Sequence, residues 1–131
     1  MTIIYETEKL KIEHEFEATF LIDKLTGTIL LEDDFYGDPT CGLIDKDNKW
    51  AIISGEHLTI WTPEKWKRIE DNDLKWIYAI RNKDSEIVER LTDPWNKNSA
   101  IWIIDTKTFK FKKLQEFTEY QDREYSENVV W

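Results

Sequence analysis

The chain is poor in the residues from which common catalytic and cofactor-binding motifs are built. Its 131 residues include four glycines, three prolines, two histidines, one cysteine and one methionine. Four glycines hardly allow a glycine-rich phosphate loop or a G-x-S-x-G nucleophile turn, and neither pattern occurs. The single cysteine excludes an internal disulfide and indicates a reducing compartment. No stretch reaches the roughly 18 apolar residues of a membrane-spanning helix.

The first residues do not have the pattern of a secretory signal. Residues 2–5 are followed at once by Glu6 and Glu8, which interrupt any apolar signal core. We therefore expect a cytoplasmic protein that neither crosses nor binds a membrane.

The few nucleophilic or metal-binding side chains form no recognisable site. Cys41 enters a predicted strand, whereas a reactive thiol usually lies at a helix N-terminus. His14 and His57 are isolated beside glutamates, so we expect solvent-facing strand histidines and no zinc site. A calcium-loop pattern that begins at Asp45 fails because Trp50 stands where the loop needs glycine. We therefore expect no catalytic residue, no metal and no cofactor.

Alternating apolar and polar residues dominate the rest of the sequence. Residues 9–13 and 109–112 alternate strictly, which is the period of a half-buried strand. Further short runs of β-branched and aromatic residues are bounded by turn residues: 17–22, 50–53, 57–61, 75–80 and 100–104. The pattern predicts a single all-β domain, 1–131. We expect antiparallel hairpins that form a β-sandwich or a strongly bent sheet, with at most one or two short helices.

A weak internal repeat runs through these strands. Leu21-Ile22-Asp23 leads through a polar turn into a second apolar run, and similar units begin near Leu43, Ala79 and Ile103. Such units predict β-hairpins, because Asp, Asn and Gly suit tight turns. The hairpins are similar to those of β-propeller blades, but the chain is too short for a closed propeller of such blades. Unrelated hairpins that look alike are the alternative.

Three segments have a less definite pattern. Residues 63–66 begin with proline, which suits the first position of a short helical turn. Residues 113–127 combine helical spacing with continued strand alternation, so helix and strand both stay open. Residues 129–131 predict a last short strand that pairs near Ile3 and Ile4.

Charge is distributed unevenly along the chain. Residues 1–64 carry 14 acidic and 5 basic side chains. Residues 65–113 carry 8 acidic and 12 basic side chains, and residues 114–131 carry 5 acidic and 1 basic side chain. The formal net charge is −9. An acidic field of this kind repels nucleic acid and speeds the encounter with basic partners. We therefore expect a protein that binds a basic macromolecule and no nucleic acid.

Two segments combine acidic residues with aromatic rings, and they contain the candidate partner-binding residues. An aromatic anchor inside an acidic rim is suited to capture a basic surface. A solvated loop and a tail packed on the core are the alternative. The candidates are Glu32, Asp33, Asp34, Phe35, Tyr36 and Asp38 in the first segment, and Glu119, Asp122, Glu124, Tyr125 and Glu127 in the second.

The tryptophans permit a second function. Those in predicted strands are expected in the core: Trp50, Trp61, Trp76 and Trp102. Trp66 and Trp95 lie near prolines outside such runs and could stack on a sugar ring. A ligand- or carbohydrate-binding β module is therefore the alternative, and a subunit of a larger assembly is a third interpretation.

In general character the chain resembles the immunity proteins of bacterial toxin systems, including those of contact-dependent growth inhibition. Residues 42–53 and the acidic, aromatic stretch 119–131 carry the resemblance. It implies a small cytoplasmic inhibitor, not an enzyme, that binds a cognate toxin domain tightly. Such a toxin is often a nuclease with a basic active face. Immunity proteins have many unrelated folds, so the resemblance assigns no residue a role.

Overall fold

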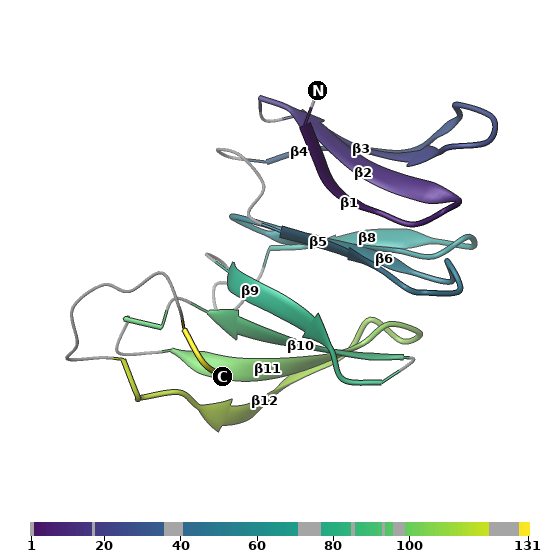
Figure 1. Cartoon of the computed structure of the whole chain (residues 1–131). Coiled ribbons are helices and arrows are strands. Elements are labelled where there is room, and N and C mark those ends of the chain that lie inside the picture. Colours follow the sequence, from purple (N-terminus) through teal and green to yellow (C-terminus); the bar gives the residue numbers. More distant parts are fainter. Residues whose placement is uncertain are drawn as a thin grey trace.

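The computed structural model describes residues 2–16, 18–35, 41–70, 77–84, 86–92, 94–95, 99–120 and 129–131. Within these residues the protein is entirely β, with twelve strands in three antiparallel four-stranded sheets and no helix. The sheets stack face to face in chain order (Figure 1). The expected all-β fold is confirmed, and its packing is sandwich-like with three layers. None of the described segments is a helix able to cross a bilayer.

Each sheet consists of four consecutive strands. Sheet 1 contains β1 (Thr2–Glu6), β2 (Leu10–Glu15), β3 (Ala18–Asp23) and β4 (Ile29–Asp34). Sheet 2 contains β5 (Cys41–Ile44), β6 (Ala51–Ser54), β7 (Leu58–Trp61) and β8 (Trp66–Ile69). Sheet 3 contains β9 (Ile77–Asn82), β10 (Ile87–Thr92), β11 (Ala100–Asp105) and β12 (Phe111–Glu116).

Sheet 2 lies between the other two, and every side chain of β6 and β7 is buried. Because both faces of these strands are buried, their sequences are nearly continuous apolar runs and do not alternate between apolar and polar residues. The core between sheets 1 and 2 is built around Ile12, Leu21, Leu31, Ile53 and Trp61. The core between sheets 2 and 3 is built around Ile52, Ile60, Val88, Ile104 and Phe109.

Two hairpins share one turn geometry. In the β3–β4 turn the amide of Asp23 donates to Thr28 O, and the amide of Gly27 donates to Asp23 O. In the β11–β12 turn Asp105 repeats both bonds, with Lys110 and Phe109 as the partners. Gly27 and Phe109 have φ of 76° and 63°. Since the left-handed region strains most side chains, glycine suits this position and phenylalanine does not.

The predicted hairpin units correspond to β3–β4, β5–β6, β9–β10 and β11–β12. They occupy the second half of sheet 1, the first half of sheet 2 and both halves of sheet 3. The structural repeat is therefore the whole four-stranded sheet, of which each hairpin is one half.

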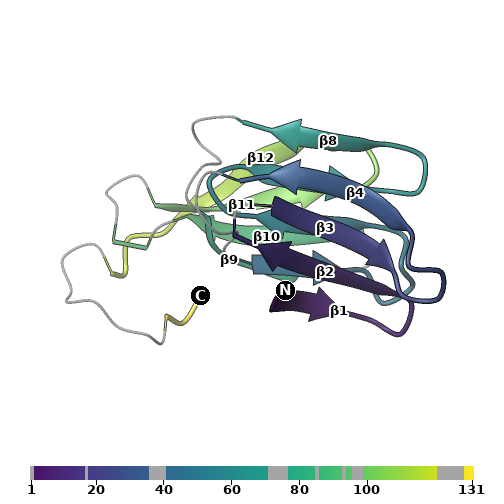
Figure 2. The same cartoon turned by 90° about the horizontal axis from the view of Figure 1, so that it is seen from above.

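The sheets approach one another along their first strands, because β5 contacts both β1 and β9. A Cβ atom on Gly42 of β5 would lie 2.9 Å from Ile12 Cδ1 and 3.2 Å from Ile4 Cγ2. Seen from above, the strand order of sheets 1 and 3 runs in the same direction, from β1 and β9 on one side to β4 and β12 on the other (Figure 2). The three sheets are thus ordered like successive blades of a propeller.

Residues 63–66 do not form the expected helical turn. Thr62 closes a tight hairpin turn, because its Oγ1 donates to Lys65 O and accepts from the Lys65 amide. β8 begins at Trp66 immediately afterwards. The hydroxyl of Thr62 thus forms hydrogen bonds with the backbone N–H and C=O of Lys65, which a helical turn would otherwise use for its own hydrogen bonds.

The C-terminal residues do not add a strand beside Ile3 and Ile4, as the sequence suggested. Val129 and Trp131 pack instead on the side of sheet 3 that faces away from sheet 2, beside Leu91 and Ile101. Within the open segment 113–127, the strand alternative is confirmed as far as Glu116. Residues 121–127 lie outside the described residues.

Candidate functional site

The first acidic segment begins in a strand rather than a loop, and the side chains of residues 32–34 divide between the two faces of that strand. β4 continues through Asp34, so successive side chains alternate between the interior and solvent. Glu32 and Asp34 are exposed, whereas Asp33 and Phe35 are buried at 6% and 1% exposure. The expectation that Asp33 is a rim acid and Phe35 an exposed anchor is therefore corrected.

Asp33 is the centre of a buried hydrogen-bond network between sheets 1 and 2. Its Oδ2 accepts a hydrogen bond from His57 Nε2 at 2.9 Å and a second from Thr59 Oγ1. Its Oδ1 accepts from Arg68 Nε at 3.1 Å, from Arg68 Nη2 and from the Asp34 amide at 3.0 Å. Every donor except that amide belongs to sheet 2, so the network joins the two sheets.

Burial and hydrogen bonding act on the Asp33 carboxyl in opposite directions. Burial raises its pKa, but hydrogen bonds from His57, Thr59 and Arg68 outweigh this and hold the pKa at about 2. The carboxylate is therefore charged at neutral pH and is stabilised by donors. His57 is only 1% exposed, and the network joins side chains of two sheets, so it contributes to the packing of sheet 1 on sheet 2.

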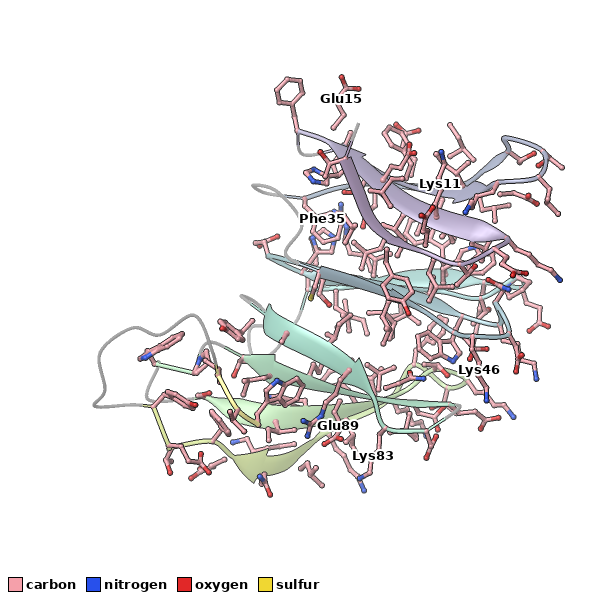
Figure 3. All side chains as sticks on the ribbon, viewed as in Figure 1. Lys11, Glu15, Phe35, Lys46, Lys83 and Glu89 are labelled. Atoms are coloured by element: carbon pink, nitrogen blue, oxygen red, sulfur yellow. The ribbon has the colours of Figure 1, made fainter. Side chains whose placement is uncertain are left out.

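His57 is not the solvent-facing histidine that the sequence suggested. Its ring stacks on Phe35 with centroids 4.0 Å apart and an interplanar angle of 9°. Figure 3 shows Phe35 between sheets 1 and 2. The second nitrogen, Nδ1, lies 3.4 Å from Glu56 Oε2. Sequence reasoning missed this arrangement because Asp33 and His57 lie 24 residues apart and on different sheets.

The outer surface of sheet 1 gathers the acids that remain exposed. The strand register places three rows on this surface: Ile3, Glu13, Phe20 and Glu32; Glu15, Ala18 and Asp34; and Glu6, Lys11, Ile22 and Ile29. We call these residues the acidic face. Their carboxylates outnumber the single ammonium group five to one. Glu15 points away from the body of the protein (Figure 3).

Some of these acids are already neutralised and others are free to meet a partner. Lys11 Nζ lies 2.6 Å from Glu13 Oε1, and Lys24 Nζ lies 3.1 Å from Glu6 Oε2. Among the residues that the structure describes, Glu15, Glu32 and Asp34 have no ion-pair partner. The unneutralised charge therefore lies at the end of the face nearest the β2–β3 turn.

An exposed aromatic residue stands at that same end. Phe16 follows Glu15 in the β2–β3 turn, is 82% exposed and has a φ of 54°. A bulky side chain in the left-handed region costs about 1–2 kcal/mol relative to a residue with normal φ. Strain that is kept without any packing in return is typical of functional positions. The acid–aromatic–acid pattern around Phe16 was the available sequence signal, and it was missed.

The second acidic segment does not join the acidic face. Glu119 is exposed, but its neighbours Phe117 and Tyr120 pack on sheet 3. Two remaining candidates of the first segment, Tyr36 and Asp38, lie outside the described residues. So do the other candidates of the second segment: Asp122, Glu124, Tyr125 and Glu127.

The tryptophans divide largely as expected. Trp50 and Trp61 are buried, and Trp102 is partly buried against the core of sheets 2 and 3, whereas Trp76 lies outside the described residues. Trp66 is 49% exposed on β8, at the edge of sheet 2. Trp95 packs edge-on against Tyr78 and Tyr120, so it is not presented as a flat platform for a sugar.

Cys41 is not set up as a nucleophile. Burial raises the pKa of its thiol to about 11, and this outweighs the opposite effect of a hydrogen bond with Ser54. The thiolate is the reactive form, so a thiol of this pKa is nearly inert at neutral pH. Across the described part of the chain, no three His, Cys, Asp or Glu side chains are grouped so that they could hold a metal ion.

Comparison with known proteins assigns no family. Neither the models of known protein families nor the curated protein sequences match this chain.

Proposed function

We propose that this protein is an immunity protein that captures the basic surface of a cognate toxin domain with its acidic face. The observation that carries the proposal is the position of Phe16, which is strained, 82% exposed and next to the unneutralised Glu15. Aromatic residues that project from a polar rim supply most of the binding energy in protein interfaces.

The charges on the acidic face support the choice of a basic partner. Glu15, Glu32 and Asp34 project from strands of one sheet, so they are held in fixed positions relative to Phe16. Exposed charges of one sign accelerate association with a surface of the opposite sign and contribute less to the lifetime of the complex. The aromatic anchor and the carboxylates therefore have separable roles.

Substitution of the anchor tests the proposal most directly. Phe16→Gly should weaken binding to the toxin domain encoded beside the gene by about 2 kcal/mol or more, measured by calorimetry. The same substitution should leave the fold as stable or stabilise it, because glycine relieves the left-handed strain. Leu25→Gly is the matched control, since Leu25 is 78% exposed in the β3–β4 turn at the opposite end of sheet 1. Equal affinity losses for both variants would contradict the proposal.

Charge reversal tests the role of the carboxylates. Glu32→Lys with Asp34→Lys should slow association, and the effect should fade as salt is raised, because surface charges are screened. Glu116→Lys with Glu119→Lys reverses two exposed acids on the side of sheet 3 and is the control. If the control pair slows association and the first pair does not, the contact lies at the second acidic segment.

A further inference from the structure

A cavity of about 410 Å³ lies between sheets 2 and 3, at the end of the molecule where hairpin turns of both sheets meet. Its lining includes Trp50 and Thr106, which are both buried. Pro63 of the β7–β8 turn adds a further apolar side chain. A mostly apolar concave surface with a few polar groups is typical of a site for a small ligand, and the volume lies within the usual range for such sites.

The turns of sheets 1 and 2 meet in a different way at this end of the molecule. There, Thr7 Oγ1 of the β1–β2 turn donates a hydrogen bond of 2.5 Å to Asn48 Oδ1 of the β5–β6 turn. Between sheets 2 and 3, a long side chain reaches across: Lys65 Nζ of the β7–β8 turn lies 4.7 Å from the centroid of the Phe109 ring. The cavity lies beside this side chain.

Three lysines and two glutamates line the cavity, and one lysine is already paired. Lys107 Nζ lies 2.8 Å from Glu86 Oε1, so these two side chains neutralise each other. Within the described part of the chain, Lys49 and Lys65 have no ion-pair partner. Glu64 is the second glutamate of the lining, and it forms no ion pair with either lysine. The cavity therefore carries a net positive charge, although the formal net charge of the chain is −9.

Further lysines follow along the outer strands of the same two sheets. Lys67 of β8 pairs with Ile60, so it lies on the face of sheet 2 that packs toward sheet 3. Lys113 of β12 pairs with Trp102 on the facing side of sheet 3, and its Nζ lies 5.9 Å from the centroid of that ring. The positions of β8 and β12 on these facing sides include no acid: Lys67, Ile69, Phe111 and Lys113. The positive charge beside the cavity thus continues along β8 and β12, which lie on one side of the molecule (Figure 2).

The outer strands of sheets 1 and 2 have the opposite arrangement. Arg68 of β8 donates to Asp33 of β4, so a charge on one strand is neutralised by a charge on the other. The lysines of β8 and β12 meet no acid on the facing strand. Positive charges gathered at a concave, partly apolar surface attract anions, and a bound anion would supply the negative charge that Asp33 supplies between sheets 1 and 2.

We propose that the cavity binds a small organic phosphate, with the phosphate group bound by Lys49 and Lys65 and the apolar part packed against Trp50 and Pro63. A lysine ammonium group binds phosphate as a point charge and does not need the two-pronged geometry of arginine. A phosphate monoester carries about two negative charges near neutral pH, so it suits two lysines better than a carboxylate does. The site belongs to sheets 2 and 3, so this inference does not rest on the proposed function.

Calorimetry with phenyl phosphate tests the site, because this probe combines one phosphate group with one aromatic ring. The unaltered protein should bind it saturably, with a Kd on the order of 1 mM. Inorganic phosphate lacks the ring and should bind at least about tenfold more weakly. Benzoate has the ring but a single charge and should bind at least about threefold more weakly.

Substitutions at the cavity test its position. Lys49→Gln with Lys65→Gln should weaken the binding of phenyl phosphate about tenfold, whereas Glu64→Gln should strengthen it, because the acid of the lining repels the ligand. Lys83→Gln with Lys112→Gln is the matched control, since it removes two charges from exposed positions that do not line the cavity. Figure 3 shows Lys83 at the turn of sheet 3. Urea unfolding of each variant checks that the fold is retained.

A titration followed by nuclear magnetic resonance locates the site without any substitution. On addition of phenyl phosphate, the amide signals of Lys49, Trp50 and Lys65 should shift, and those of the outer surface of sheet 1 should not.

Each result supports or overturns a defined part of the inference. The absence of saturable binding up to about 20 mM phenyl phosphate overturns the site. Equal losses for the Lys49, Lys65 variant and its control, or signal shifts confined to other parts of the protein, overturn its position at the cavity. Inorganic phosphate that binds as tightly as phenyl phosphate overturns the apolar contact, and benzoate that binds as tightly overturns the preference for phosphate. All of these outcomes leave the capture of a toxin by the acidic face standing.

Discussion

Sheets 1 and 3 have the same strand order and one identical turn, yet they pack on sheet 2 through different chemistry. Sheet 1 is joined to sheet 2 by an apolar core and by the charged network around Asp33, which receives donors from three side chains of sheet 2. Sheet 3 is joined to sheet 2 by the core around Ile104 and Val88, and the fully buried Arg90 of β10 lies in the same interface near Cys41 of β5. One topology thus supports an interface with a buried, hydrogen-bonded carboxylate and another in which the buried charge is an arginine within an apolar core.

The surfaces of these two sheets that face away from sheet 2 differ as well. Sheet 1 presents the acidic face without any covering segment among the described residues, whereas sheet 3 is partly covered by Trp131 and its neighbours. A terminal sheet must either be polar or be covered, because an exposed apolar face promotes association. Sheet 1 combines carboxylates with Phe20 and Ile22, which is suited to a face that meets a partner and also stays soluble.

The largest effect should follow from removing Asp33. Asp33→Ala leaves His57 buried without its acceptor and should cost about 3–5 kcal/mol, the usual cost of breaking a buried charged pair. Urea unfolding measures the loss. A variant that replaces the network with apolar residues, Asp33→Leu with His57→Leu and Thr59→Val, should recover much of it. A loss below about 1 kcal/mol for Asp33→Ala would show that apolar packing alone holds sheet 1.

The next effect is a dependence of the free energy of unfolding on pH, which arises from the Asp33 carboxyl. The Asp33 pKa of about 2 lies below the value of about 3.9 in an unfolded chain, so folding favours the ionised form. Its contribution is complete above about pH 5 and is lost as the pH falls toward 2. The stability difference between the unaltered protein and Asp33→Ala should therefore shrink by about 2–3 kcal/mol between pH 6 and pH 2. The loss caused by Ile104→Ala should stay constant over that range, and a parallel decline would attribute the acid sensitivity to other groups.

Local pattern was sufficient to predict most of the strands and turns. Alternation identified residues 9–13 as a half-buried strand, and continuous apolar runs identified β6 and β7 of sheet 2, because burial on one or two faces determines which positions are apolar. β8 was missed, because it is mostly exposed and has no apolar run. The turns at Asp23 and Asp105 followed from residues that hydrogen-bond to their own backbone.

Features that depend on contacts between sheets were beyond such patterns. Burial of His57 is compensated by its hydrogen bond to Asp33 on another sheet, and Asp33 is buried because the alternation of β4 continues past residue 32. Phe109 occupies a left-handed position because its ring is buried in the core between sheets 2 and 3, which offsets the strain. Phe16 also has a left-handed backbone conformation, but its ring is not buried. The sequence alone could not reveal this difference, because it does not give the conformation of the turn.

The smallest expected effect on stability concerns the C-terminal residues that cover part of sheet 3. The guanidinium of Arg81 lies 4.0 Å from the centroid of the Trp131 ring and also donates to Trp131 O. Because the Arg81 side chain is 43% exposed, the cation–π contact should contribute only about 0.5–1 kcal/mol.

A double-mutant cycle of Arg81→Ala and Trp131→Leu, followed by urea unfolding, measures this coupling without the separate losses of each residue. Lys83→Ala is the control, since Lys83 is exposed in the adjoining turn. A coupling near zero would show that Trp131 is held by Leu91 and Ile101 alone. A coupling above about 2 kcal/mol would mean that charge holds the cover of sheet 3 as firmly as it joins sheet 1 to sheet 2, and the contrast between the two sheets would then fail.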